Sequence, residues 1–91
     1  MWRLAASDYD LDWAALKAKG LAQIDAGVGT IDLSEWTKAS SAHLAILVFW
    51  WQSARARGHS LAFSGLNPTF QQLAALGGVE FIQTGEADAG H

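Results

Sequence analysis

The sequence predicts an α/β fold in which helices pack against a mixed, mainly parallel sheet of about four strands. Short runs of aliphatic and β-branched residues alternate with longer segments of helical spacing, in the order strand, helix, strand, helix, strand, helix, strand. The chain has 91 residues, of which 51% are hydrophobic and 16% charged, so it suits one domain with a modest core. We expect this single domain to cover residues 1–84 and a flexible tail to cover residues 85–91.

The first two strands are expected on either side of a helix. Residues 2–7 form a short apolar segment that is typical of a strand. The first helix is expected to begin at Asp10 or Asp12, since acidic side chains suit a helix start. The glycine-flanked and β-branched stretch over residues 27–34 predicts the second strand.

The second helix is predicted to begin near Ser40 or Ser41 and to end near Arg57. Gly58 follows it directly and is a typical C-terminal stop signal. The apolar alternation over residues 59–65 then predicts the third strand.

The third helix has the clearest end signals. Asn67 is placed to cap it, Pro68 suits its first position and Gly77 suits its end. The apolar residues 79–83 predict a fourth and final strand.

Composition excludes several classes of function. The net charge is -3 and the pI is about 5.4, without a basic stripe, so we expect neither a nucleic-acid partner nor binding to an anionic membrane surface. The longest apolar run, Leu44–Trp51, is far shorter than the roughly 20 residues of a membrane span, so direct membrane insertion is not expected. The chain has no cysteine, so it forms neither a disulfide nor a thiolate metal site. No secretory signal is expected from the first ten residues.

The central helix is apolar around nearly its whole circumference, which leaves two interpretations open. Two stripes of large side chains can be drawn on it at helical spacing. They are Leu44, Leu47, Val48 and Trp51 on one side, and Ile46, Phe49 and Trp50 on the other. Either both stripes lie in the core, or one is exposed in the monomer and is covered by a partner. The five tryptophans of the chain also favour an interaction surface, because a small core holds few of them.

Ser41 and His43 are the polar residues at the start of this helix. The Ser41 hydroxyl could cap the helix, contact a partner or be phosphorylated. A nucleophile–base pair is not favoured, because residues two apart do not face each other on a helix. We expect His43 to be an exposed residue of the first turn, without a metal ligand set around it.

The acidic residues Asp8, Asp10 and Asp12 are spaced as in a calcium-binding loop. Such a loop needs a glycine at its sixth position and a glutamate at its twelfth, where this chain has Trp13 and Lys19. We therefore expect a solvated helix start rather than a metal site, and no cofactor elsewhere.

Four short stretches occur in a recognisable order over residues 30–83. "DLS" at residues 32–34 ends a strand, and "SSAHL" at residues 40–44 opens an apolar helix. The helix end "ARARG" follows at residues 54–58, and then come "LAF" and the glycine-containing turn "SGL" at residues 64–66. In this order the chain resembles the STAS domain family, which includes the bacterial anti-sigma-factor antagonists and the MlaB-like cytoplasmic STAS subunits of Mla-type phospholipid ABC transporters. The large apolar residues of the helix make the transporter subunit the closer likeness.

The resemblance implies a STAS-like fold from which the first family strand is missing. STAS domains usually place two strands before the first helix, whereas this chain has only about ten residues there. The sheet would then have an open edge that another chain could cover, including a second copy in a homodimer.

The resemblance also implies a non-catalytic interaction domain. The first reading is an accessory subunit that binds the cytoplasmic ATPase of a phospholipid-trafficking ABC transporter, supports its assembly or activity, and lies at the inner membrane through that complex. The alternative is an antagonist that binds an anti-sigma kinase and is switched by phosphorylation at Ser41. The partner-facing surface implied lies at the start of the second helix, around Ser40, Ser41 and His43. We add Trp50 of the same helix as a candidate partner-binding residue. Ser40 stands where the family usually has an acidic residue, and Ala42 and His43 replace a usual glycine, which favours docking over a switch.

Overall fold

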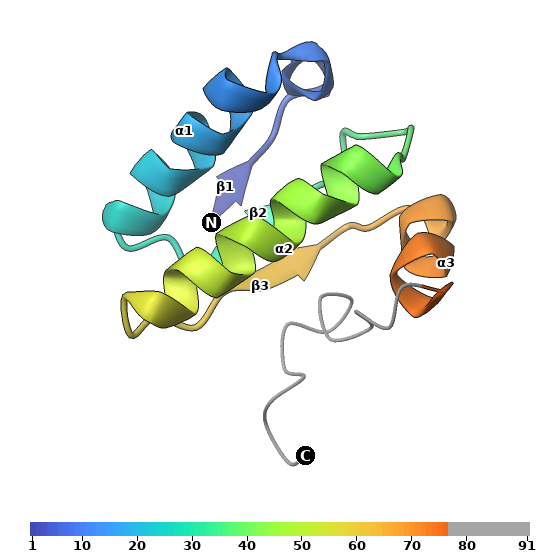
Figure 1. The fold of residues 1–91 in the computed structure, drawn as a ribbon. Helices are drawn as coiled ribbons and strands as arrows, with labels where there is room; N and C mark the ends of the chain where they lie inside the picture. Colours follow the sequence, from blue (N-terminus) through green and yellow to red (C-terminus); the bar gives the residue numbers. More distant parts are fainter. Residues whose placement is uncertain (77–91) are drawn as a thin grey trace.

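Three parallel strands form the sheet in the computed structural model, which describes residues 1–76 (Figure 1). They are β1 (Trp2–Arg3), β2 (Thr30–Asp32) and β3 (Ala62–Ser64), in the order β1-β2-β3. The alternation of strands and helices predicted from the sequence is confirmed over this range. The predicted strand over residues 79–83, the helix stop at Gly77 and the tail lie outside the described residues.

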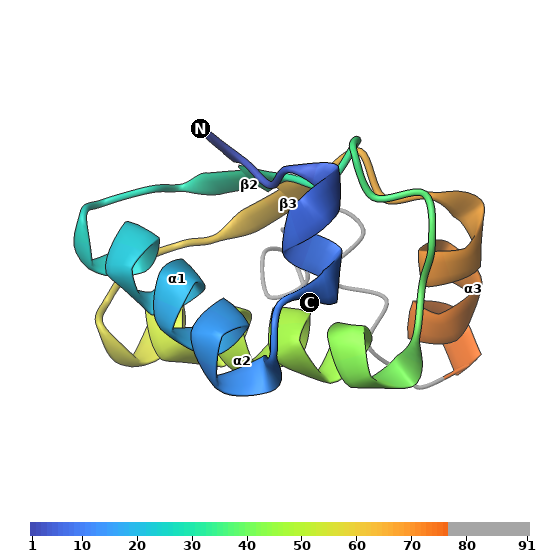
Figure 2. The same ribbon diagram turned by 90° about the horizontal axis from the view of Figure 1, so that it is seen from above.

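The helices α1 (Trp13–Asp25) and α2 (Ser41–Ala56) cover the same face of this sheet (Figures 1 and 2). Figure 2 shows the sheet edge-on, with both helices on one side and α3 (Pro68–Leu76) beyond one end of the strands. Each parallel strand thus follows its predecessor through a helical crossover, as parallel pairing requires. The described part of the chain is an α/β domain consistent with a STAS-like fold that lacks one strand.

The register of the sheet separates an apolar face from a polar one. Trp2, Ile31 and Phe63 are paired side by side, and Trp2 lies edge-on against the ring of Trp50 on α2. This face therefore packs on the helices. Alternate residues point to the other face, where Arg3 pairs with Asp32.

The segment between β1 and α1 corrects one prediction. We expected a strand over residues 2–7, but the strand ends at Arg3 and a short 3-10 helix, η1 (Ala6–Asp10), follows. The Asp8 carboxylate accepts a hydrogen bond from the backbone N–H of Ala5 at 2.8 Å and from Lys19 Nζ at 2.6 Å. These two bonds favour a helical turn over a continued strand, because a local carboxylate–backbone bond competes with sheet pairing.

Trp50 fills the centre of the core and corrects a second prediction. Its side chain is fully buried, and its indole Nε1–H donates to the backbone oxygen of Lys17 at 3.2 Å. A Cβ built on Gly20 would overlap this indole ring, so the glycine is what lets α1 approach α2 here. We expected Trp50 to be a partner-binding residue, whereas the indole is inside the domain and holds α1 against α2.

The helix ends agree with the sequence signals. The Asp12 carboxylate caps α1 by accepting from the N–H of Ala15 at 2.8 Å, and the Asn67 side chain caps α3 by accepting from the N–H of Phe70 at 2.9 Å. Gly58 follows α2 with a φ of 78°, a left-handed conformation that glycine adopts freely. Local chemistry therefore sets where each helix starts or stops.

Candidate interaction site

The buried stripe of α2 runs between the two stripes drawn from the sequence. The residues that it buries have i, i+3, i+4, i+7 spacing. They are His43, Ile46, Leu47, Trp50 and Ala54. Large apolar residues on the flanks, such as Leu44, Val48 and Phe49, are only half-buried. Each predicted stripe therefore has buried and half-buried members, because the side of α2 that faces the core lies between the two stripes.

Ser40, and not Ser41, caps this helix. The Ser40 Oγ accepts a hydrogen bond from the backbone N–H of His43 at 3.0 Å. Ser41 is the first residue of α2 and is exposed. The expectation that the Ser41 hydroxyl could be the cap is therefore wrong, and Ser41 is left on the surface.

The buried imidazole of His43 is hydrogen-bonded to the half-buried Ser40. Its Nε2 lies 2.8 Å from the backbone oxygen of Tyr9, and its Nδ1 lies 2.6 Å from Ser40 Oγ. A carbonyl oxygen only accepts, so Nε2 must carry the hydrogen. In the neutral ring Nδ1 is then the acceptor, and the Ser40 hydroxyl donates to it.

Three aromatic rings enclose the same imidazole. Tyr9 stacks on it with 3.6 Å between ring centroids, while Trp36 and Trp13 meet it edge-on at 5.4 and 5.0 Å. His43 is only 4% exposed, so the prediction that it is an exposed first-turn residue is wrong. We call Tyr9, Trp36, Ser40 and His43 the aromatic lock, because these contacts join η1 and the loop before α2 to the start of α2.

The structure thus brings a serine and a histidine together, although not the pair considered from the sequence. The hydroxyl of Ser40 is occupied by the helix cap and by the imidazole, and the second ring nitrogen is bound to Tyr9. A nucleophile must be presented to a substrate, whereas this imidazole is buried among three rings. The arrangement fits a structural role in fixing the start of α2.

A groove lies between α1 and α2, next to the aromatic lock. It has a volume of about 280 Å³ and is lined by Trp13, Lys17, Ala42, Ala45, Ile46 and Phe49. Trp13 is 48% exposed, and the Lys17 ammonium lies 5.3 Å from the centre of the Phe49 ring. We call this feature the α1–α2 groove. Ser41 lies one turn before the lining residue Ala45, at i and i+4 on the same side of α2, so the exposed start of α2 is continuous with the groove.

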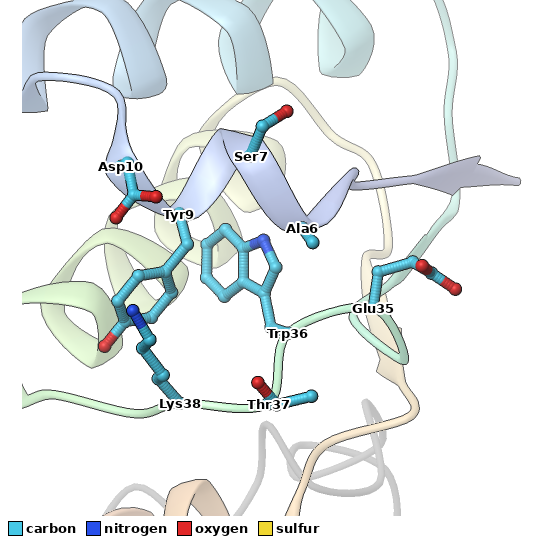
Figure 3. Close-up of a pocket in the computed structure, with 8 residues that line it drawn as sticks. All are labelled: Ala6, Ser7, Tyr9, Asp10, Glu35, Trp36, Thr37 and Lys38. Atoms are coloured by element: carbon cyan, nitrogen blue, oxygen red, sulfur yellow. The ribbon is translucent and has the colours of Figure 1, made fainter.

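A second pocket of about 260 Å³ is lined in part by Tyr9 and Trp36 of the aromatic lock (Figure 3). It is formed by η1 and the loop before α2, and its lining residues are Ala6, Ser7, Tyr9, Asp10, Glu35, Trp36, Thr37 and Lys38. Two carboxylates and one ammonium line it, so the charge does not select an ion of one sign. Within residues 1–76 no cluster of histidine and acidic side chains could hold a metal ion.

Asp32, in the "DLS" stretch, stabilises the end of β2. Its Oδ1 accepts from the N–H of Ser34 at 2.8 Å, and its Oδ2 accepts from Arg3 Nε at 3.0 Å. The hydrogen bonds from Ser34, and then the Arg3 guanidinium, lower the pKa of Asp32 below its usual value of 3.8. Gly65 packs closely here, since a Cβ on it would lie 2.8 Å from Asp32 Oδ1. This carboxylate therefore fixes the loop that leads to Trp36 and α2.

The four predicted partner-binding residues fall in three environments. Ser41 is exposed, Ser40 is a half-buried cap, and His43 and Trp50 are buried. The stripe drawn from the sequence included Ile46 and Phe49 of the groove, but reasoning from the sequence missed its residues on α1, above all Trp13. The signal available for Trp13 in the sequence was an aromatic residue directly after the capping Asp12. In the structure Trp13 faces the start of the neighbouring helix.

Searches for related proteins gave one family. The family model described as "Mlab, STAS domain" matches residues 6–84 of the chain. Neither the curated proteins nor the solved structures gave a match. No helix among residues 1–76 has the length and apolar character needed to cross a membrane. The family match extends over much more than half of the chain and agrees with the helices, the parallel sheet and the "DLS" loop, and we conclude that this chain belongs to the MlaB-type STAS domain family.

Proposed function

We propose that this protein is an accessory subunit that binds the cytoplasmic ATPase of a phospholipid-trafficking ABC transporter. STAS domains are generally non-catalytic interaction domains, and the match to the MlaB type favours a transporter over other partners. The observation that carries the proposal is the exposed start of α2, where Ser41 stands at the position that the family uses for its partners. Through this partner the protein would lie in the cytoplasm at the inner membrane.

The surroundings of Ser41 support a docking surface. Ala42 and Ala45 are exposed and small, and the half-exposed indole of Trp13 lies beside them. The aromatic lock holds this end of α2 in place, so little ordering is needed when a partner binds. A preformed surface of this kind lowers the entropic cost of association.

A second candidate function is that of an anti-sigma-factor antagonist. The observation in its favour is that Ser41 is exposed and that Ser40, not Ser41, is used as the cap. A phosphate on Ser41 would lie at the start of α2, where the helix dipole favours a negative charge, and the first turn has no acidic residue to repel it. Replacement of the usual glycine by Ala42 and His43 argues for the transporter instead.

Binding to purified ATPase tests the first proposal. The full chain and the ATPase subunit of a Mla-type transporter should co-elute as a stable complex, with a Kd that isothermal titration calorimetry can measure. An ATPase that elutes separately at micromolar concentrations of both proteins would refute the proposal. Incubation with an anti-sigma kinase and ATP tests the second candidate, which requires one added phosphate on Ser41 by mass spectrometry.

A further inference from the structure

The pocket lined by Tyr9, Trp36 and Lys38 lies between two segments that are far apart in sequence, and we call it the η1 pocket (Figure 3). One wall is η1, and the other is the loop that joins β2 to α2. The Trp36 indole joins the two walls, since its Nε1–H donates to the backbone oxygen of Ala5 at 3.1 Å and its ring meets Tyr9 edge-on at 5.2 Å. The pocket is therefore preformed, which lowers the cost of ordering when a ligand binds.

The charged side chains around this pocket differ from others in residues 1–76. Most carboxylates in that part of the chain accept a hydrogen bond from another residue. They are Asp8, Asp12, Asp25 and Asp32. Asp10 and Glu35 accept none from residues 1–76, and both line the pocket. Lys38 also lines it and forms no ion pair with these residues, although its ammonium lies 5.8 Å from the centre of the Tyr9 ring.

Charges of opposite sign flank an aromatic floor in this pocket. In Figure 3 the Trp36 indole lies in the middle, with Lys38 beside Tyr9 on one side of it and Glu35 on the other. Trp36 is only 2% exposed, so its ring is a fixed floor. Glu35 and Lys38 are three residues apart, which separates their Cα atoms by at most about 10 Å. One short molecule can therefore reach both charges.

Size and charge together define the class of ligand. The volume of about 260 Å³ is below the roughly 300–1,000 Å³ of pockets for drug-sized molecules, so the ligand is small. A lone anion would be repelled by Asp10 and Glu35, and a lone cation by Lys38. A molecule that carries both charges can donate from an ammonium to a carboxylate and accept from the Lys38 ammonium, while its carbon chain packs on Trp36.

We propose that the η1 pocket binds a small zwitterion, whose primary ammonium faces Glu35 and whose carboxylate or phosphate faces Lys38. Tyr9 and Trp36 also enclose His43, so the bound zwitterion stabilises the aromatic lock and with it the start of α2. Binding needs no ATPase. It is tested on the full chain alone, and its outcome is independent of the proposed function.

Four small probes test the charge requirement. O-phosphoethanolamine and 4-aminobutyrate carry both charges, whereas ethanolamine carries only the ammonium and inorganic phosphate only the anion. We expect a zwitterion to bind with a Kd of about 0.1–1 mM by isothermal titration calorimetry, at least about tenfold more tightly than either single-charge probe. At ten times its Kd it should raise the Tm by about 5 °C. No binding of either zwitterion at about 10 mM, or equal binding of the single-charge probes, would overturn the proposal.

Substitutions locate the two charges. Lys38→Ala and Glu35→Gln should each weaken binding of the zwitterion about tenfold. Lys17→Ala and Asp25→Asn are the matched controls, because they remove exposed charges of the same signs on α1, outside the pocket, and should leave the Kd unchanged. Thermal unfolding without a probe checks that each variant is folded. A Kd that stays at the wild-type value in both pocket variants would refute the site.

The indole N–H signals in nuclear magnetic resonance spectra show where the probe binds. The Trp36 indole lies at the floor of the pocket, whereas the Trp50 indole is buried against α1. Titration should shift the Trp36 signal and leave the Trp50 signal in place. A zwitterion that binds without shifting the Trp36 signal would lie elsewhere, which would overturn the proposal.

The same pair of charges occurs in free small molecules and in the headgroup of a zwitterionic lipid. Cosedimentation with phosphatidylethanolamine vesicles distinguishes these sources, and phosphatidylcholine vesicles are the reference because their quaternary ammonium has no hydrogen to donate to Glu35. Retention on the first vesicles that Lys38→Ala removes supports the site with a lipid headgroup as its ligand. Binding of a soluble zwitterion without retention on vesicles supports the site with a free molecule.

Discussion

Two adjacent serines at the start of α2 have opposite surroundings. Ser40 is half-buried, caps the helix and bonds to His43, whereas Ser41 is exposed at the end of the α1–α2 groove. A helix turns by about 100° per residue, so neighbouring positions can face the core and the solvent. At the position that the family uses for its partners, this chain therefore has a structural residue, Ser40, directly before an accessible one, Ser41.

The tryptophans repeat the same contrast. Trp50 is fully buried and bonded to the backbone of α1, whereas Trp13 is half-exposed and forms a wall of the groove. An indole can serve either purpose because it combines a large apolar area with one donor. If the contrast holds, substitutions on the buried side should reduce stability, and substitutions on the exposed side should reduce binding.

The largest expected effect is that of Trp50→Ala. The change removes the central side chain of the core and leaves a cavity beside Gly20, so we expect a loss of about 3–5 kcal/mol in the free energy of unfolding. Urea denaturation followed by circular dichroism measures it. Trp51→Ala is the matched control, since Trp51 is only half-buried and should cost much less. Equal losses from the two variants would contradict the assignment of Trp50 to the core.

His43→Ala should have the next largest effect. It removes an imidazole packed among three rings and leaves the backbone oxygen of Tyr9 without its donor. We expect a loss of about 2–3 kcal/mol in the free energy of unfolding, which chemical denaturation measures. Ser41→Ala, at an exposed position, should change stability by less than about 0.5 kcal/mol. A His43→Ala protein as stable as the wild type would show that the aromatic lock does not hold α2.

The sequence could predict the helix ends but not the burial of His43. The caps Asp12 and Asn67 and the stop at Gly58 are local signals, and neighbouring residues predicted Asn67 and Gly58 outright and Asp12 as one of two candidates beside Asp10. The burial of His43 depends on Tyr9, which is 34 residues away, and on Trp36 in the loop before α2. Nothing near His43 in sequence indicates these rings, and so the histidine was placed on the surface.

The α1–α2 groove escaped prediction for the same reason. Phe49 and Trp13 belong to different helices, which approach each other closely at Gly20 and Trp50. Helical periodicity did show that α2 is apolar on more than one side. It could not say which side meets the sheet, because the two stripes are equally hydrophobic.

Ser41→Glu separates binding from stability. A carboxylate in the first turn of α2 is favoured by the helix dipole, so the stability should change by no more than about 0.5 kcal/mol. In a docked apolar contact the same charge is desolvated, and we expect ATPase binding to weaken about tenfold. Calorimetric titration and thermal unfolding give the two quantities. Equal losses of binding and stability would mean that Ser41 has only a structural role.

The pH dependence of stability tests the charged contact on the opposite face of the sheet, and we expect the smallest effect there. Because the pKa of Asp32 is lower in the folded chain than its usual 3.8, the stabilisation by its carboxylate is complete above about pH 5 and is lost as the pH falls through the folded pKa. Asp32→Asn should therefore be less stable than the wild type at pH 7, and the difference should shrink as the pH falls below about 4. Urea denaturation at pH 7 and pH 3 measures it, with Asp10→Asn as a control at an exposed carboxylate. A difference that stays constant between these pH values would show that Asp32 acts through its shape and hydrogen bonds, which asparagine partly keeps, and not through its charge.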